Sequence, residues 1–165
     1  MIVNETKSKV MVFGKLKDKP TFIFNNKVLD IVKEYKYLGV IVNSVLDCKG
    51  DIFRNMYSHI CDKARRCCFS VSKKIRNIGT PTFDVLLRLY DAYVVPVLNY
   101  GANIWCKIQP IDCVESVQLR YLKFALGIKD STSTLAVYGE TGRFPTYLCH
   151  QASLIKYWCR LVVLD

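Results

Sequence analysis

The 165-residue sequence lacks any long run of apolar residues. Its longest uncharged stretch, residues 92–106, falls short of the roughly 20 apolar residues that cross a bilayer, and it contains Pro96 and Gly101. The first ten residues, MIVNETKSKV, include no apolar segment typical of a secretory leader. We therefore expect no transmembrane helix and an intracellular protein, either cytoplasmic or nuclear.

The familiar catalytic signatures are also absent. The sequence contains no GxSxG, P-loop, GxGxxG or HExxH motif, and no two acidic residues are adjacent. Asp47 and Asp51 precede the first helical pattern. In this position helix capping and solvation are favoured over metal binding as the role of the two carboxylates. For His59 and His150, a surface or packing role is favoured over that of a general base. The residues predict no catalysis by this chain alone.

Eight cysteines raise the question of a disulfide scaffold or a metal site. Without a secretory leader, reduced thiols are the favoured interpretation. A zinc site needs closely spaced ligand pairs. Only Cys149 beside His150, with Cys159 further on, hints at one. The sequence therefore predicts no bound metal in this chain.

In contrast to apolar runs and catalytic motifs, positively charged residues are abundant in the sequence. The formal net charge is +10, and 51% of residues are hydrophobic. This hydrophobic content predicts a packed core rather than general disorder. The charge favours an anionic partner, either nucleic acid or an acidic membrane surface.

Residues 1–46 show the pattern of β structure. A short strand is predicted at Val10–Phe13, ended by a glycine. Asn25 and Asn26 separate two further apolar segments, and asparagine tolerates the positive φ of a tight hairpin turn. A strand at Tyr35–Asn43 completes the predicted small antiparallel sheet.

The stretch EYKYLGVIVN, residues 34–43, alternates in a way that predicts one continuous strand. Tyr35, Tyr37, Gly39 and Ile41 would then share one face. A glycine in the interior of a strand weakens it and often marks a place where a ligand or another backbone comes close. We therefore expect Gly39 to admit such an approach.

From about Asp51 onward the apolar period becomes helical. The apolar positions step by threes and fours: Phe53, Tyr57, Ile60, Ala64, Cys68, Val71, Ile75 and Ile78. Basic residues fall on the other side, and Asp62 is the only acid between Arg54 and Arg76. The predicted nucleic-acid-binding residues on this basic face are Lys63, Arg65, Arg66, Lys73, Lys74 and Arg76.

Further helices follow in residues 47–165, including one at Ile111–Leu126 and a last amphipathic helix that carries Leu148 and Trp158. Helix boundaries or chain breaks are predicted at Gly79, the Thr80–Pro81 N-cap, Pro96, Gly127, Gly139, Gly142 and Pro145. The fold class is therefore predicted as α+β: a small antiparallel sheet in residues 1–46, followed by an α-helical bundle in residues 47–165.

Four segments of the chain share a family pattern. They are NETKSKVMVFG from Asn4, EYKYLGV from Glu34, VPVLNYG from Val95 with IW after it, and AVYGETGRFP from Ala136. In this order and spacing they resemble the C-terminal half of a LINE-type (non-LTR retrotransposon) reverse transcriptase, an RNA-directed DNA polymerase. The resemblance covers nearly the full chain.

The resemblance implies roles for particular residues. The first segment would be the end of the palm, motif D, where Lys7 matches a lysine near the phosphates of the incoming nucleotide. The second would be motif E, the primer grip, in which Tyr37, Leu38 and Gly39 form a hairpin turn that holds the primer end. A plain sheet strand remains the alternative for these three residues. The later helices would be the thumb, which follows a duplex through phosphate contacts.

The family's catalytic YADD-type carboxylates lie before motif D and are not found in this sequence. Two-metal phosphoryl transfer requires such carboxylates, so the Mg²⁺ of the full-length family is expected to have no site here. We expect a non-catalytic fragment that binds RNA or DNA without reading sequence. The alternatives are a remnant that binds proteins or self-associates through exposed palm surface, and a polymerase whose missing residues come from another chain.

Overall fold

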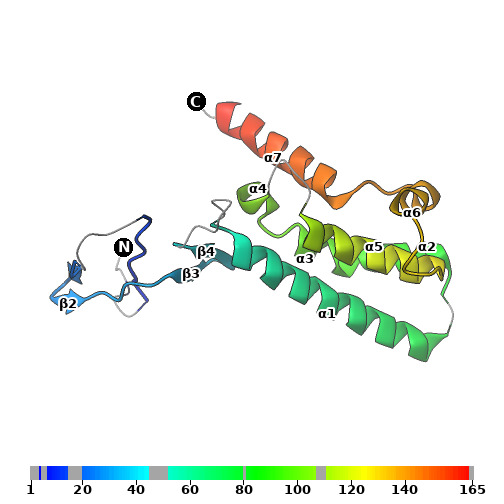
Figure 1. The fold of residues 1–165 in the computed structure, drawn as a ribbon, viewed down its shortest axis with the longest axis horizontal. Coiled ribbons are helices and arrows are strands. Elements are labelled where there is room, and N and C mark those ends of the chain that lie inside the picture. The colour runs from blue at the N-terminus through cyan, green and yellow to red at the C-terminus, as the bar shows by residue number, and fades with distance from the viewer. Residues whose placement is uncertain are drawn as a thin grey trace. The chain divides into compact units, whose positions relative to one another are not determined.

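The structure is a computed structural model that describes residues 4, 7–14, 20–44, 52–79, 81–106 and 111–163. The chain divides into two compact units, Met1–Met56 and Tyr57–Asp165. Figure 1 labels the helices and strands along the chain. The strands are β1 (Ile23–Phe24), β2 (Lys27–Val28), β3 (Glu34–Tyr37) and β4 (Val40–Asn43). The helices are α1 (Arg54–Ile78), α2 (Phe83–Tyr93), α3 (Val95–Leu98), α4 (Ala102–Trp105), α5 (Asp112–Leu126), α6 (Thr134–Thr141) and α7 (Thr146–Val163).

The first hairpin joins β1 to β2 through the predicted asparagine turn. Asn25 and Asn26 have φ values of 47° and 57°, and Phe24 pairs with Lys27 across them. Two successive residues with positive φ are what a two-residue type I′ turn requires. The turn prediction is confirmed, although each strand is only two residues long.

The second hairpin corrects the prediction of one continuous strand at 34–43. β3 and β4 are antiparallel, with Tyr37 paired to Val40, so the chain reverses at Leu38 and Gly39. These two residues have φ values of 47° and 85°. The two-residue turn shifts the alternation of side chains by one position, so Ile41 shares a face with Lys36 and not, as predicted, with Tyr37. Residues 40–42 are all apolar, which is why the sequence pattern did not reveal this shift.

The two hairpins form separate two-stranded sheets, so the prediction of a single small sheet was wrong in this respect. The predicted strand at Val10–Phe13 is also absent. Val10 forms one parallel bridge to Ile31, and residues 11–13 lie in no strand. The α+β class is nevertheless confirmed: small antiparallel sheets precede a set of helices.

Residues 52–56 hold the second hairpin in place within the first unit. The amide of Asn43 donates to the Ile52 carbonyl at 2.9 Å, and the amide of Ile41 donates to the sulfur of Met56 at 3.3 Å. The Asn55 side chain donates to Glu34 and to Asn43. The open end of the hairpin, where Glu34 pairs with Asn43, is therefore attached to this segment. The predicted junction at 46/47 lies outside the described residues.

The long helix α1 has the predicted apolar side. Tyr57, Ile60, Ala64, Val71 and Ile75 are buried. Gly79, with a φ of 118°, follows its last residue as predicted. Because the period of the apolar residues matches the turn of a helix, their burial fixes which side of α1 faces solvent.

Pro96 ends α2, as predicted, and occupies the first turn of the short α3, where its missing N–H costs nothing. The N-cap of α2 is Thr82, two residues later than predicted. α5 stops at Gly127, which has a left-handed φ of 67°. Gly139 does not break the chain, because it lies inside α6, and Gly142 ends that helix instead.

Within the helical unit, α1 runs along one side and α7 along the other, with α2, α3 and α5 between them (Figure 1). The largest fully buried side chains in this unit include Trp105, Tyr90 and Leu122. Tyr57 of α1 joins this core, with its hydroxyl donating to the Trp105 carbonyl at 3.3 Å. Among the described residues, no helix has the length and apolar character needed to pass through a bilayer.

Candidate nucleic-acid interface

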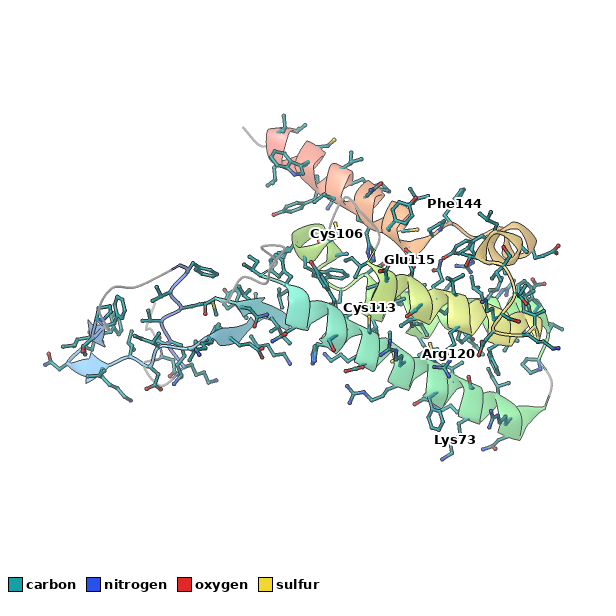
Figure 2. The ribbon with its side chains drawn as sticks, viewed as in Figure 1. Lys73, Cys106, Cys113, Glu115, Arg120 and Phe144 are labelled. Carbon is teal, nitrogen blue, oxygen red and sulfur yellow. The ribbon has the colours of Figure 1, made fainter. Side chains whose placement is uncertain are left out.

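All six predicted nucleic-acid-binding residues lie on α1 and are exposed. A helix turns about 100° per residue, so they divide into two groups. Arg65, Arg66, Lys73 and Arg76 fall within an arc of about 100°, and Lys63 and Lys74 lie about 60–80° beyond it. We call the first four, together with the surface between them, the basic arc. Figure 2 shows Lys73 on the side of α1 turned away from α5.

One carboxylate lies within the basic arc. Asp62 accepts a hydrogen bond from Arg65 at 3.3 Å, and its backbone carbonyl accepts one from Nε of Arg66 at 3.2 Å. The side chains of the Arg65–Asp62 ion pair are 51% and 57% exposed. Exposed pairs of this kind contribute about 0–1 kcal/mol, so Arg65 can leave Asp62 for a stronger anion at little cost. The arc thus retains a net positive charge.

The packing of the opposite side of α1 fixes the direction in which the basic arc faces. Ala64 and Ile60 are 0% and 2% exposed, and the Tyr57 ring lies 5.7 Å from the Trp105 ring, centroid to centroid. Burial of such side chains contributes about 1.5–3 kcal/mol each for the larger ones. Rotation of α1 about its axis would expose them, so the arc keeps its orientation.

The three primer-grip-like residues lie at the β3–β4 turn. Tyr37 and Leu38 are 65% and 75% exposed. The φ of 85° at Gly39 is a conformation that residues with a Cβ adopt at a cost. Gly39 therefore lies in a turn and not, as predicted, in the interior of a strand. Leu38, at φ 47°, adopts the left-handed region despite its side chain.

Lys7 lies beside the second hairpin through its backbone. The Tyr35 hydroxyl donates to the Lys7 carbonyl at 3.0 Å, and the Lys7 side chain is exposed. The next lysine, Lys9, pairs with Asp30 at 2.5 Å, and its hydrogen bond lowers the pKa of that carboxyl. The motif D-like and primer-grip-like segments are therefore neighbours within the first unit.

Among the described residues, His150, Cys149 and Cys159 of α7 belong to no metal-binding group. His150 is buried on α7, with Nε2 3.0 Å from Oδ1 of Asn99, and burial lowers its pKa. Cys149 and Cys159 are free and exposed. In the part of the chain that the structure describes, no cluster of three His, Cys, Asp or Glu side chains could hold a metal ion.

Sequence reasoning missed three features of the helical unit. Glu115 of α5 accepts hydrogen bonds from the amides of Thr146 and Tyr147 at 3.1 and 2.7 Å, so it caps α7 from another helix (Figure 2). Cys61 donates a hydrogen bond to Cys113, and this bond lowers the pKa of the Cys113 thiol. Both contacts join residues far apart in sequence, and no local pattern reveals them.

The third missed feature is Phe69, which is 70% exposed within the basic arc. Its position could have been read from the helical period, since it lies four residues from both Arg65 and Lys73.

Comparisons with known proteins do not place the chain: no protein-family model, curated protein or solved structure matches it.

Proposed function

We propose that the chain is a palm-end and thumb portion of a LINE-type reverse transcriptase that binds RNA or DNA without reading sequence. The observation that carries the proposal is the exposed basic arc on a helix whose other side is buried. The order of the four family-like segments supports the polymerase origin.

The chemistry of the arc favours contacts with phosphates over contacts with bases. Arginine and lysine side chains on a solvent-facing helix neutralise phosphates and release counterions, which gives affinity without sequence preference. Such binding has a Kd of about 10⁻⁴ to 10⁻⁶ M at physiological salt. The sequence contains no two adjacent acidic residues such as the family's YADD-type motif supplies.

A charge-reversal variant tests the proposal. It changes four basic residues to glutamate: Arg65, Arg66, Lys73 and Lys74. The affinity of this variant for oligonucleotides of several unrelated sequences should fall by similar factors. A matched control reverses the same amount of charge on exposed residues of other segments: Arg88, Lys129, Lys156 and Arg160. If both variants lose the same affinity, net charge and not the α1 surface is responsible, and the proposal fails.

The β3–β4 turn is proposed to contact the end of a primer. Tyr37 and Leu38 offer exposed apolar surface at a tight turn. A non-glycine residue held at positive φ is a reason to look for function, because a less strained residue would serve the turn better. Crosslinking from a photoreactive primer 3′ end, compared with an internal label, would test this contact.

A second candidate function, self-association, rests on a different observation. The first hairpin exposes Ile23 and Val28 at 65% and 61%, and α7 exposes Ile155 and Trp158 at 61% each. Exposed apolar residues and unpaired strand edges of this kind promote association between chains. Sedimentation of the purified protein at micromolar concentration tests it, and a clean monomer there argues against it.

A further inference from the structure

The basic arc contains an aromatic ring that phosphate contacts do not explain. Among the α1 residues whose side chains the structure describes, Phe69 is the only large apolar one that is exposed. A single exposed apolar side chain is ordinary on a protein surface. What distinguishes Phe69 is its surroundings: of the four residues one turn away along the helix, Arg65, Arg66 and Lys73 are cations and the fourth is Ser72.

The spacing places these cations around the ring on both sides along the helix. Arg65 and Arg66 precede Phe69 by one turn, and Lys73 follows it by one turn. At 1.5 Å per residue, the arc from Arg65 to Arg76 is about 16 Å long, and Phe69 lies within it. An unpaired strand that follows the arc would have its phosphates near the cations and a base beside the ring.

We propose that α1 binds an unpaired stretch of nucleic acid, with one base stacked on Phe69 and the flanking phosphates held by Arg65, Arg66 and Lys73. This inference rests on the proposed function and names its ligand class: single-stranded RNA or DNA, or an unpaired end next to a duplex. Proteins that bind single strands without sequence preference combine a positive surface with aromatic side chains on which bases stack. A base-paired strand keeps its bases inside the helix and has no free face for the ring.

The prediction concerns the difference between two probes. One is an oligodeoxythymidylate about 12 nucleotides long, within the usual range for single-strand binders, and the other is a duplex of equal length. Phe69→Ala should weaken binding of the single strand about 5- to 150-fold, the range that one stacked base supplies. Binding of the duplex should change less than about twofold, since its phosphate contacts remain.

Further variants separate stacking from apolar contact. Phe69→Tyr keeps the ring and should retain single-strand affinity, whereas Phe69→Leu keeps apolar bulk without a π face and should behave like Phe69→Ala. Phe144→Ala is the matched control, because Phe144 is 71% exposed and lies outside α1 (Figure 2). Phe69→Trp adds a reporter, whose fluorescence should be quenched by the oligonucleotide and not by the duplex. Circular dichroism verifies that each variant is folded.

Several outcomes overturn the inference. One is an unchanged single-strand affinity in Phe69→Ala while the wild type still binds duplex with the expected salt dependence, which leaves the proposed function standing. Equal losses for both probes would also overturn it. So would a loss of self-association in Phe69→Ala with nucleic-acid binding intact, since the ring would then contact protein. If the wild type binds neither probe, both proposals fail together.

Discussion

The salt dependence of nucleic-acid binding is the prediction that the geometry of α1 defines most closely. The basic arc spans about 16 Å, and one strand of a duplex presents a phosphate about every 3.4 Å along its axis. About five phosphates therefore lie within reach, enough to engage all four basic residues of the arc. The affinity constant for duplex DNA should then fall with the logarithm of salt concentration with a slope of about −3.6.

This slope translates into a large and measurable effect. Raising salt from about 50 to about 200 mM should weaken duplex binding about 150-fold, and single-strand binding about 50-fold, because single strands release fewer counterions per contact. Fluorescence anisotropy with a labelled oligonucleotide across this range gives both slopes. The double variant Arg66→Ala/Lys73→Ala should reduce the steepness of the duplex slope by about 1.8.

A matched control locates the effect. Lys129→Ala/Lys156→Ala removes the same charge from exposed positions outside α1 and should leave the slope within about 0.5 of the wild type. A wild-type slope near zero would refute the reasoning, because binding would then not depend on phosphates. An equal change of slope in the double variant and its control would also refute it.

Three further predictions concern stability. Leu38→Asn should stabilise the second hairpin by about 1 kcal/mol, since asparagine adopts a φ of 47° more readily; slower amide exchange at Val40 would show this, and faster exchange would contradict it. Glu115→Ala should lower the free energy of unfolding by about 3 kcal/mol in urea, and Glu115→Gln by less because it keeps an acceptor; equal effects would count against the capping role. Burial lowers the pKa of His150 below its ordinary 6.5, so the folded state disfavours its protonation. Stability should therefore be full above pH 6.5 and decline as pH falls below it, and His150→Gln should flatten this decline in thermal melts at a series of pH values; a variant with the wild-type profile would exclude His150 as the cause.

The helices were the part of the fold most accessible from sequence. The apolar period of α1 extends over many turns, and Gly79 and Gly127 end α1 and α5 where left-handed geometry requires them. Gly139 was misinterpreted because a glycine near a helix end can lie before or after the last turn. Local patterns thus located helices well and their last residues less well.

The β region was harder to predict, for a physical reason. The two-residue turn between Tyr37 and Val40 shifts the faces by one position, but residues 38–42 include no polar side chain that would reveal the shift, so periodicity alone could not separate a hairpin from a strand. The family resemblance did imply a turn at Leu38 and Gly39. For the candidate interface, sequence located the cations of α1 on a solvent-facing side. The sequence did not show that Asp62 forms an ion pair with Arg65, since this pair depends on side-chain conformation.

Because the β3–β4 turn has only two residues, this hairpin is sensitive to insertions and deletions at the turn. If one residue were inserted here and β4 slipped by one position to keep a two-residue turn, every side chain of β4 would turn to the other face of the sheet. Ile41, now buried, would then lie where Val42 lies, and the contacts of Asn43 with residues 52 and 55 would be lost. Any related sequence that keeps this hairpin should therefore keep its loop at two residues.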